Sequence, residues 1–151
     1  MKIAEFRSMH PILGTRDIER ALEFYMTRLG FSLAFRDGST PTNYAGIRRG
    51  AVEVHLQWQG PEEMQRTRLR FGVSDPDALL TEFKGRDVQI RTDIRDTPWG
   101  MREFALYDPD RNALTFSRHW CKSGSFAALR HEHSMTLARP RTLLSRGWLA
   151  F

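Results

Sequence analysis

The spacing of apolar residues changes from strand-like to helix-like and back along the first 60 residues. A short apolar run over 9–14 predicts a strand. Apolar residues then recur every three or four positions over 18–29, which predicts a helix that Thr15 or Asp17 caps and Gly30 ends. Alternating or apolar runs over 31–35, 44–48 and 51–58 predict three strands.

The same order begins again near residue 68. A strand is predicted over 68–73, and a helix follows it, capped by Ser74 or Asp75 and ended by Gly85. Three more strands are predicted over 88–91, 101–107 and 113–116. The run 108–112 between the last two reads as a hairpin-type turn, in which Asn112 is able to take a positive φ.

The chain therefore reads as βαβββ twice, in modules over about 5–60 and 66–120. This predicts an α+β domain over 1–120, in which two curved, barrel-like sheets enclose a cleft. Residues 121–151, here called the C-terminal tail, have no counterpart in the repeat. We expect the tail to be poorly ordered or to dock late, and its apolar end is a candidate plug for the cleft.

Charge is distributed unevenly between these two parts. The 151 residues carry a net charge of +5, but the tail has five cations and one acid, whereas residues 1–121 have 18 cations and 17 acids. The near-neutral body gives no support to nucleic-acid binding, although the tail is a candidate for recruiting an acidic partner. The single cysteine, the lack of a long apolar stretch and the interrupted apolar character of the N-terminus predict a cytoplasmic protein without a membrane partner.

Three motifs resemble the vicinal-oxygen-chelate superfamily, which includes glyoxalase I, extradiol dioxygenases and bleomycin-resistance proteins. The run 10–25 (HPILGTRDIERALEFY), followed by Leu29-Gly30-Phe31, is similar to the family's opening. The run 108–112 (DPDRN) resembles its DPDGN hairpin, with Arg111 in place of the glycine. The run 98–104 (PWGMREF) resembles the bleomycin-resistance branch, and the resemblance covers about residues 5–120.

The resemblance implies four positions at which metal-dependent members hold a divalent ion. The first falls on His10 and the second near Glu53, with His55 two residues on and on the same strand face. The third falls within 68–70 and the fourth on Thr115, so module two supplies no His, Glu, Asp or Cys at either position. Since catalytic zinc sites normally use three protein ligands, we expect no metal cofactor. His10, Glu53 and His55 remain the alternative metal ligands.

The bleomycin-resistance branch implies a homodimer that sequesters a drug without catalysis. We therefore expect an aromatic or heterocyclic, antibiotic-like ligand in a dimer cleft. The candidate ligand-binding residues are Trp99, Phe35, Tyr44, His55, Trp58, Arg70, Arg102 and Phe104.

Several alternatives stay open. Trp99 is equally a candidate for closing the end of the sheet or the dimer seam, and Trp58 for the core. Arg68 and Arg70 either orient an acidic ligand or form a solvated face. The near-neutral body argues against bleomycin itself, which is cationic. A metal-dependent glyoxalase- or dioxygenase-type enzyme with a degenerate ligand set is the alternative function.

Overall fold

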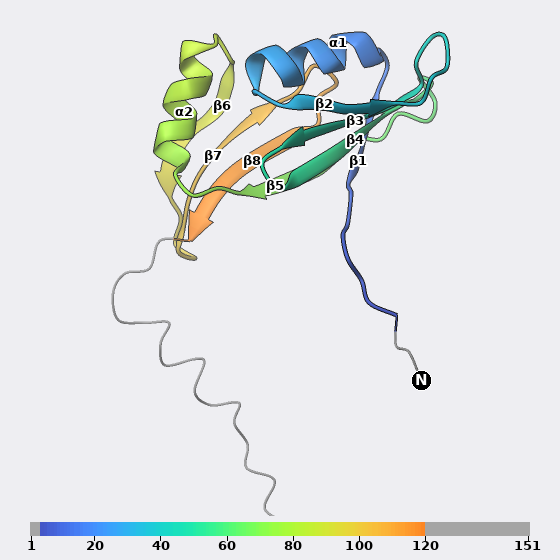
Figure 1. Ribbon diagram of the computed structural model, residues 1–151. Coiled ribbons are helices and arrows are strands. Elements are labelled where there is room, and N and C mark those ends of the chain that lie inside the picture. The colour runs from blue at the N-terminus through green and yellow to red at the C-terminus, as the bar shows by residue number, and fades with distance from the viewer. Residues whose placement is uncertain (1–3, 120–151) are drawn as a thin grey trace, which may run out of the picture. The chain divides into compact units, whose positions relative to one another are not determined.

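The computed structural model describes residues 4–119, which form two four-stranded sheets with helices on one side (Figure 1). The chain divides into units over Met1–Trp120 and Cys121–Phe151. The expectations for the tail, including its order and the plug, fall outside the described residues. Within the described part, no helix is long and apolar enough to cross a membrane.

Module one forms sheet A, whose strand order is β1-β4-β3-β2. β1 runs parallel to β4, and the other neighbours are antiparallel. Its elements are β1 (Ile12–Thr15), α1 (Ile18–Glu23), the π-helix η1 (Phe24–Arg28), β2 (Ser32–Arg36), β3 (Tyr44–Arg49) and β4 (Val52–Trp58).

Module two forms sheet B with the equivalent order, β5-β8-β7-β6. β5 runs parallel to β8, and the other pairs are antiparallel. Its elements are β5 (Arg68–Gly72), α2 (Pro76–Gly85), β6 (Ile90–Asp96), β7 (Met101–Tyr107) and β8 (Ala113–His119). The predicted repeat of βαβββ and the α+β class are thus confirmed, and the strand predicted over 88–91 is displaced to β6.

Both helices begin as the sequence predicts. The side chain of Asp17 accepts a hydrogen bond from the Arg20 amide at 3.0 Å, and that of Asp75 accepts one from the Ala78 amide at 3.0 Å. These bonds satisfy amides that have no partner within the helix. The first helix differs from the prediction at its end, because its last turn widens into η1, where Leu29 N–H donates to the Phe24 carbonyl.

One apolar core joins the two modules on the helix side of the sheets. The rings of Phe31 and Phe71 lie 6.4 Å apart, and the Phe71 ring stacks on that of Phe116 at 5.0 Å. Tyr25 also belongs to this core, where its side chain is fully buried. Since burying a large apolar side chain contributes about 1.5–3 kcal/mol, these rings hold the modules together as one unit.

The 108–112 turn of module two docks onto module one. The Asp110 carboxylate accepts hydrogen bonds from the Thr15 hydroxyl at 2.6 Å and the Arg20 guanidinium at 2.8 Å. The Tyr25 hydroxyl donates to the Asp108 carboxylate at 2.9 Å. Burial is the main reason that the pKa of Asp108 lies above its ordinary value and that the pKa of Tyr25 lies well above its own.

Asn112, which the sequence offered for the positive φ of this turn, does not take it. Arg111 has the left-handed conformation, with φ of 69°. Asn112 instead is fully buried, and its side chain accepts from the Thr67 amide at 2.9 Å and donates to the Gly14 carbonyl at 3.2 Å. Its side chain also donates to the Asp108 carboxylate at 2.8 Å, so Asn112 links the turn to two other segments.

Candidate functional site

The face of sheet A that points away from the helices, here called the open face of sheet A, gathers aromatic and titratable side chains. Along β4, Val54 and Leu56 are buried in the core, so the alternation of strand side chains turns Glu53 and His55 to the open face. The register places Gly46 of β3 opposite His55. The prediction that Glu53 and His55 share a strand face is thus confirmed.

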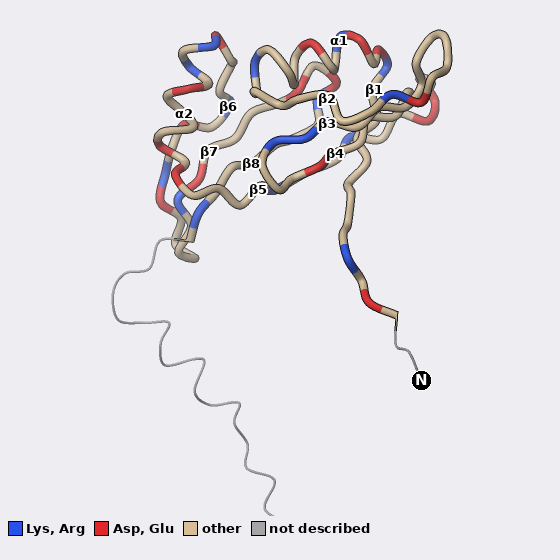
Figure 2. Tube along the Cα trace, viewed as in Figure 1, with Lys and Arg blue, Asp and Glu red and all other residues tan. Residues whose placement is uncertain are grey.

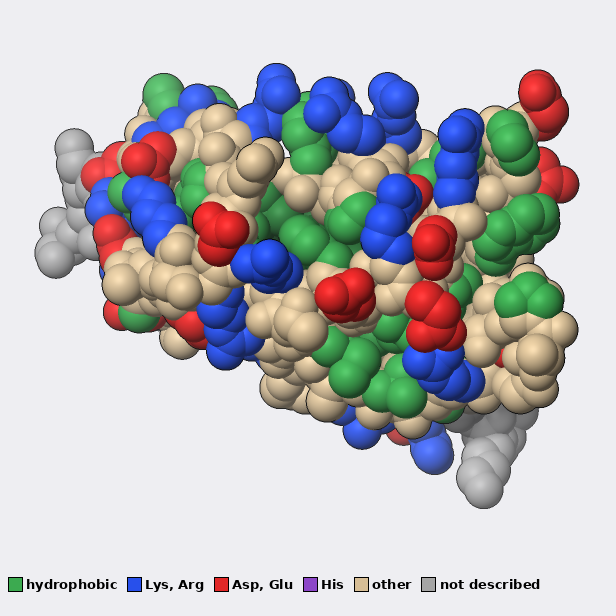
Figure 3. Space-filling model, turned by 90° about the horizontal axis from the view of Figure 1, so that it is seen from above, with side chains coloured by type: hydrophobic (Ala, Val, Ile, Leu, Met, Phe, Trp, Pro, Cys, Tyr) green, Lys and Arg blue, Asp and Glu red, His purple; other side chains and the backbone are tan. Residues whose placement is uncertain are grey.

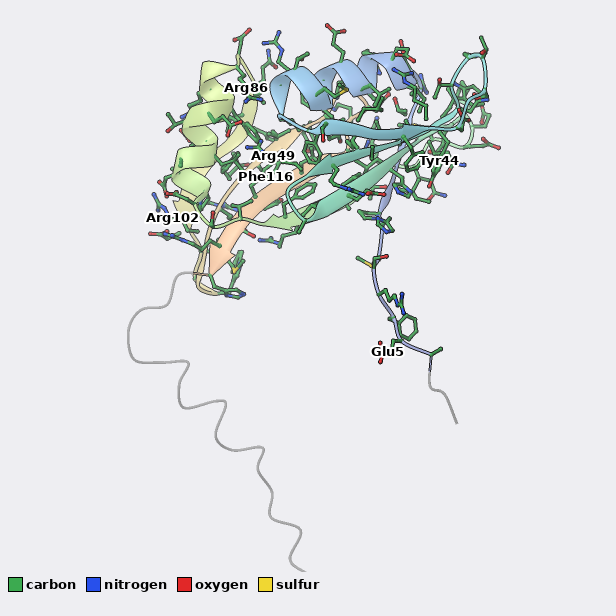
Figure 4. All side chains as sticks on the ribbon, viewed as in Figure 1. Glu5, Tyr44, Arg49, Arg86, Arg102 and Phe116 are labelled. Carbon is green, nitrogen blue, oxygen red and sulfur yellow. The ribbon has the colours of Figure 1, made fainter. Side chains whose placement is uncertain are left out.

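Three rings pack together on this face. The Tyr44 hydroxyl lies 2.8 Å from His55 Nδ1, and the Phe35 ring meets the His55 ring edge-on at 5.1 Å. Phe35 and Tyr44 stack at 6.1 Å (Figure 4 labels Tyr44 on β3). A Cβ at Gly46 would lie 2.2 Å from a Phe35 ring carbon, so the missing side chain lets the Phe35 ring lie across the strand.

His10 joins this group from the segment that precedes β1. Its ring stacks on that of His55 at 5.0 Å, and its Nδ1 lies 3.7 Å from a Glu53 carboxylate oxygen. The same oxygen lies 3.1 Å from His55 Nε2. We call His10, Glu53 and His55 the His–Glu cluster, since one ligand atom from each lies within 4.8 Å of the others.

The chemistry of the His–Glu cluster gives mixed support for a metal ion. Three potential ligands from two imidazoles and a carboxylate match the number in catalytic zinc sites. However, the Arg48 guanidinium donates to the other Glu53 oxygen at 3.0 Å, and this bond, then that from His55, holds the pKa of Glu53 below its ordinary value. The cation beside it would oppose a bound ion.

Module two has no metal-ligating side chain at the two positions implied by the family, which fall within 68–70 and on Thr115. Arg70 and Thr115 are register partners on β5 and β8. Arg70 donates to the Glu103 carboxylate at 2.6 Å, and Arg95 lies 3.3 Å from the other oxygen of that group. Glu103 therefore serves as the partner of two arginines.

Of the eight predicted ligand-binding residues, four lie on open faces, and one lies in a turn. Phe35, Tyr44 and His55 come together on sheet A, and Arg70 lies on the corresponding open face of sheet B. Trp99 occupies the turn between β6 and β7, where its side chain is 63% exposed.

The other three lie elsewhere, for reasons of strand alternation. Phe104 is fully buried between the rings of Phe83 and Phe116, so it packs under α2 and is not accessible to a ligand. Arg102, also on the α2 side, pairs with Asp77 at 2.6 Å and with an acid on β6 (Figure 4). Trp58 is half exposed, beside the β2–β3 loop on the helix side of sheet A.

The helix side of the molecule has a different character from the open faces. Seen from above, it carries interspersed acidic and basic side chains around apolar ones (Figure 3). The charges are likewise mixed along the helices and strands (Figure 2). No described histidine is visible on the surface seen in Figure 3, in keeping with the place of His10 and His55 on the open face.

Sequence reasoning missed a cavity at the seam between the modules. It has a volume of about 550 Å³ and lies between the β3–β4 turn and α2, lined partly by Phe31, Phe71 and Leu79. Arg49 crosses the seam, donating to Glu82 of α2 at 2.8 Å (Figure 4). The apolar spacing in α2 signals its packing face, but no local pattern shows that the β3–β4 turn approaches it.

Known proteins share this architecture. The model of the Glyoxalase/Bleomycin resistance protein/Dioxygenase superfamily matches residues 7–116. A bleomycin resistance protein from Geobacillus stearothermophilus is 27% identical over 126 residues, covering 70% of this chain and 92% of its own.

Two solved structures agree with this. The bleomycin-binding protein of Streptomyces verticillus, complexed with copper(II)-bleomycin, has 29% identity and a TM-score of 0.66, covering 78% of this chain and all (100%) of its own. The bleomycin resistance determinant encoded on the transposon Tn5 has 21% identity and a TM-score of 0.66, over 77% of this chain and 100% of its own, and supports the fold. The matched residues include both modules and the turn that joins them, and the chain belongs to the glyoxalase/bleomycin resistance/dioxygenase superfamily.

Proposed function

We propose that this protein is a bleomycin-resistance-like binding protein that sequesters an aromatic or heterocyclic small molecule without catalysis. The observation that carries the proposal is the ring platform of Phe35, Tyr44 and His55 on the open face of sheet A. The relatives support it, because they include bleomycin resistance and bleomycin-binding proteins.

The platform suits a flat ligand. Phe35 is 37% exposed and lies beside a hydrogen-bonded Tyr44–His55 pair, so it offers an apolar ring next to polar groups that orient a heterocycle. Glu53 adds one carboxylate at the edge of the platform, although Arg48 neutralises it. The ligand class therefore extends beyond strongly cationic drugs such as bleomycin.

A second copy of the chain would complete the site. On sheet A the Phe35 ring is exposed to solvent and Tyr44 and His55 are half-buried. A lone sheet face buries a small fraction of a drug-sized ligand, whereas binding sites bury most of it. We propose a homodimer in which another copy covers this face. Light scattering at micromolar concentration should give the mass of two chains, and a monomer would contradict the dimer cleft.

Calorimetric titration with bleomycin and with copper(II)-bleomycin tests the function. Phe35→Ala should weaken binding about tenfold, since a central aromatic contact contributes at least about 1.4 kcal/mol. Leu33→Ala is the matched control, because Leu33 lies on the same strand and is 40% exposed, but it pairs with Ile47, which faces the core. If the two substitutions weaken binding equally, the platform is not part of the binding site. If neither probe gives heat of binding, bleomycin is not the ligand.

The His–Glu cluster favours a second candidate, a metal-dependent enzyme of the same superfamily. In that case His10, Glu53 and His55 would hold a divalent ion, which supplies a Lewis acid for the substrate's oxygens. Metal analysis of protein purified without chelator decides between the two. Less than about a tenth of an equivalent of bound metal would reject the enzyme and keep the binding protein as the proposed function, since a resident catalytic ion occupies most chains.

A further inference from the structure

The open face of sheet B ends in a cavity whose charged lining is entirely basic. Near the β7–β8 turn, a cavity of about 440 Å³ is lined by eleven residues, none of them acidic. We call its four arginines, all exposed, the arginine cluster: Arg66, Arg68, Arg91 and Arg111. Three threonines, Thr115 among them, add hydroxyl groups to the same wall.

These arginines differ from their neighbours in having no acidic partner among the residues that the structure describes. Within residues 4–119, no carboxylate oxygen lies within 4.0 Å of a guanidinium nitrogen of the arginine cluster, whereas Arg70 and Arg95 share Glu103 on the adjoining part of this face. Like charges gathered without a counter-ion repel each other. The arrangement is therefore one that an incoming anion would stabilise.

Tyr107 holds two of the four guanidinium groups in place. The guanidinium carbon of Arg91 lies 4.7 Å from the centre of the Tyr107 ring, and that of Arg111 lies 4.8 Å from it. Stacking on an aromatic ring leaves the N–H groups at the edge of a guanidinium free to donate. The ring thus positions the guanidinium groups of Arg91, on β6, and Arg111, in the turn, and leaves their N–H groups available to a ligand.

The backbone at Arg111 is a second, independent observation. Its φ of 69° is a left-handed conformation that favours glycine, so an arginine here is disfavoured by its own Cβ. A strained position occupied by a long cationic side chain, directed onto Tyr107 at the cavity, points to a role for that side chain.

We propose that the arginine cluster binds an anionic group, a carboxylate or a phosphate, of a small molecule. Guanidinium groups match both anions with paired hydrogen bonds. A small molecule is favoured over a nucleic acid because the basic site is one cavity, and residues 1–121 carry only one cation in excess, 18 against 17 acids. The proposal goes beyond the ring platform on sheet A and does not depend on it.

Calorimetric titration of the full chain with pyrophosphate and with citrate tests this site, and the two probes separate phosphate from carboxylate recognition. Arg91→Gln and Arg111→Gly should each lower the affinity for the tighter-binding probe about fivefold or more. Raising NaCl from about 0.1 M to about 0.5 M should also lower the affinity of the wild type for this probe. Arg7→Gln is the matched control, because it removes one exposed cation outside the cavity. A thermal melt checks that each variant is folded.

Four results would overturn the proposal. The first is no binding of either probe at about 10 mM, and the second is wild-type affinity in both Arg91→Gln and Arg111→Gly. The third is a loss of affinity confined to an Arg139→Gln/Arg141→Gln variant, which would place the anion on the tail. A short DNA duplex is also added to protein that holds the tighter-binding probe. If the duplex displaces the probe when it is present at a lower concentration than the probe, the ligand is a nucleic acid and the small-molecule assignment fails. Bleomycin binding in the absence of anion binding would leave the proposed function standing and refute this site alone.

Discussion

Replacing Tyr25 by Phe removes one hydroxyl group from the junction between the modules. That hydroxyl donates to the Asp108 carboxylate at 2.9 Å, and both side chains are buried. The substitution keeps the ring and its edge-on contacts with Phe24 and Phe31, at 5.5 and 5.7 Å. Its effect on stability therefore measures the hydrogen bond across the junction.

The expected loss of unfolding free energy at neutral pH is about 2 kcal/mol. Hydrogen bonds to charged groups contribute about 1.5–3 kcal/mol. The lower part of that range applies, because the ionised Asp108 still accepts from the Asn112 side chain at 2.8 Å and from the Asp110 amide at 2.9 Å.

The pH dependence carries the sharper test. Burial raises the pKa of Asp108 above 3.8, while the Tyr25 bond lowers it, so Tyr25→Phe should raise this pKa further. Because the pKa of Asp108 is higher in the folded than in the unfolded state, ionising Asp108 lowers the free energy of unfolding. The deficit, meaning the free energy of unfolding that Tyr25→Phe loses relative to the wild type, should therefore grow as pH rises through the range just above 3.8. The folded protein also keeps Tyr25 protonated above 10.0, where the unfolded chain loses that proton, so the wild type should lose stability there and the deficit should shrink.

Urea unfolding at about pH 4.5, 7 and 10.5 measures this profile. Tyr107→Phe is the matched control, since the Tyr107 hydroxyl makes no hydrogen bond to another described residue and its loss should change stability by less than about 0.5 kcal/mol. A deficit that stays constant across the three pH values would refute the coupling between Tyr25 and Asp108. A deficit no larger than that of Tyr107→Phe would refute the bond's contribution altogether.

Three further substitutions test the turn and the two exposed sites. Asn112→Ala should cost about 3 kcal/mol in urea unfolding, because it leaves the half-buried Thr67 amide and the buried Asp108 carboxylate short of partners; a loss under about 1 kcal/mol would contradict this. Gly46→Ala should displace the Phe35 ring and weaken ligand binding in calorimetry, whereas Gly72→Ala, whose Cβ meets nothing within 4 Å, should not. Trp99→Ala should leave the melting temperature nearly unchanged, since the side chain is 63% exposed, but reduce the ligand-induced fluorescence change.

The fold is predictable from this sequence because its signals are local. Apolar periodicity, the two aspartate caps and the glycines that end the helices lie within each element, and each acts on its own neighbours. The 108–112 turn is different, because Asp110 bonds Thr15 across 95 positions and Asn112 bonds Gly14 across 98. No local pattern specifies such partners, which is why a turn signal was visible and its docking role was not.

The candidate site was predictable only where strand alternation applied. Residues two apart on one strand share a face, and that rule joins Glu53 to His55. Strand alternation does not say which face of a sheet is open, so the sequence alone does not separate the aromatic residues that a ligand can reach from those in the core. Phe104 lies under α2, and Phe35 crosses to the open face at an irregularity in β2 that shifts its register against β3.

The two open faces divide the chemistry of the molecule between them. Sheet A presents rings and the His–Glu cluster. Sheet B presents two arginines that share Glu103, and the arginine cluster, which has no acidic partner within residues 4–119. A ligand with a flat ring and an acidic group would suit both faces, provided that a second copy brings sheet B of one chain opposite sheet A of the other. In that arrangement, Phe35→Ala and Arg91→Gln would weaken the same ligand, and a mixture of the two variants would restore one intact cleft in each mixed dimer. Recovery of tight binding in part of the mixture therefore distinguishes a shared cleft from two separate sites.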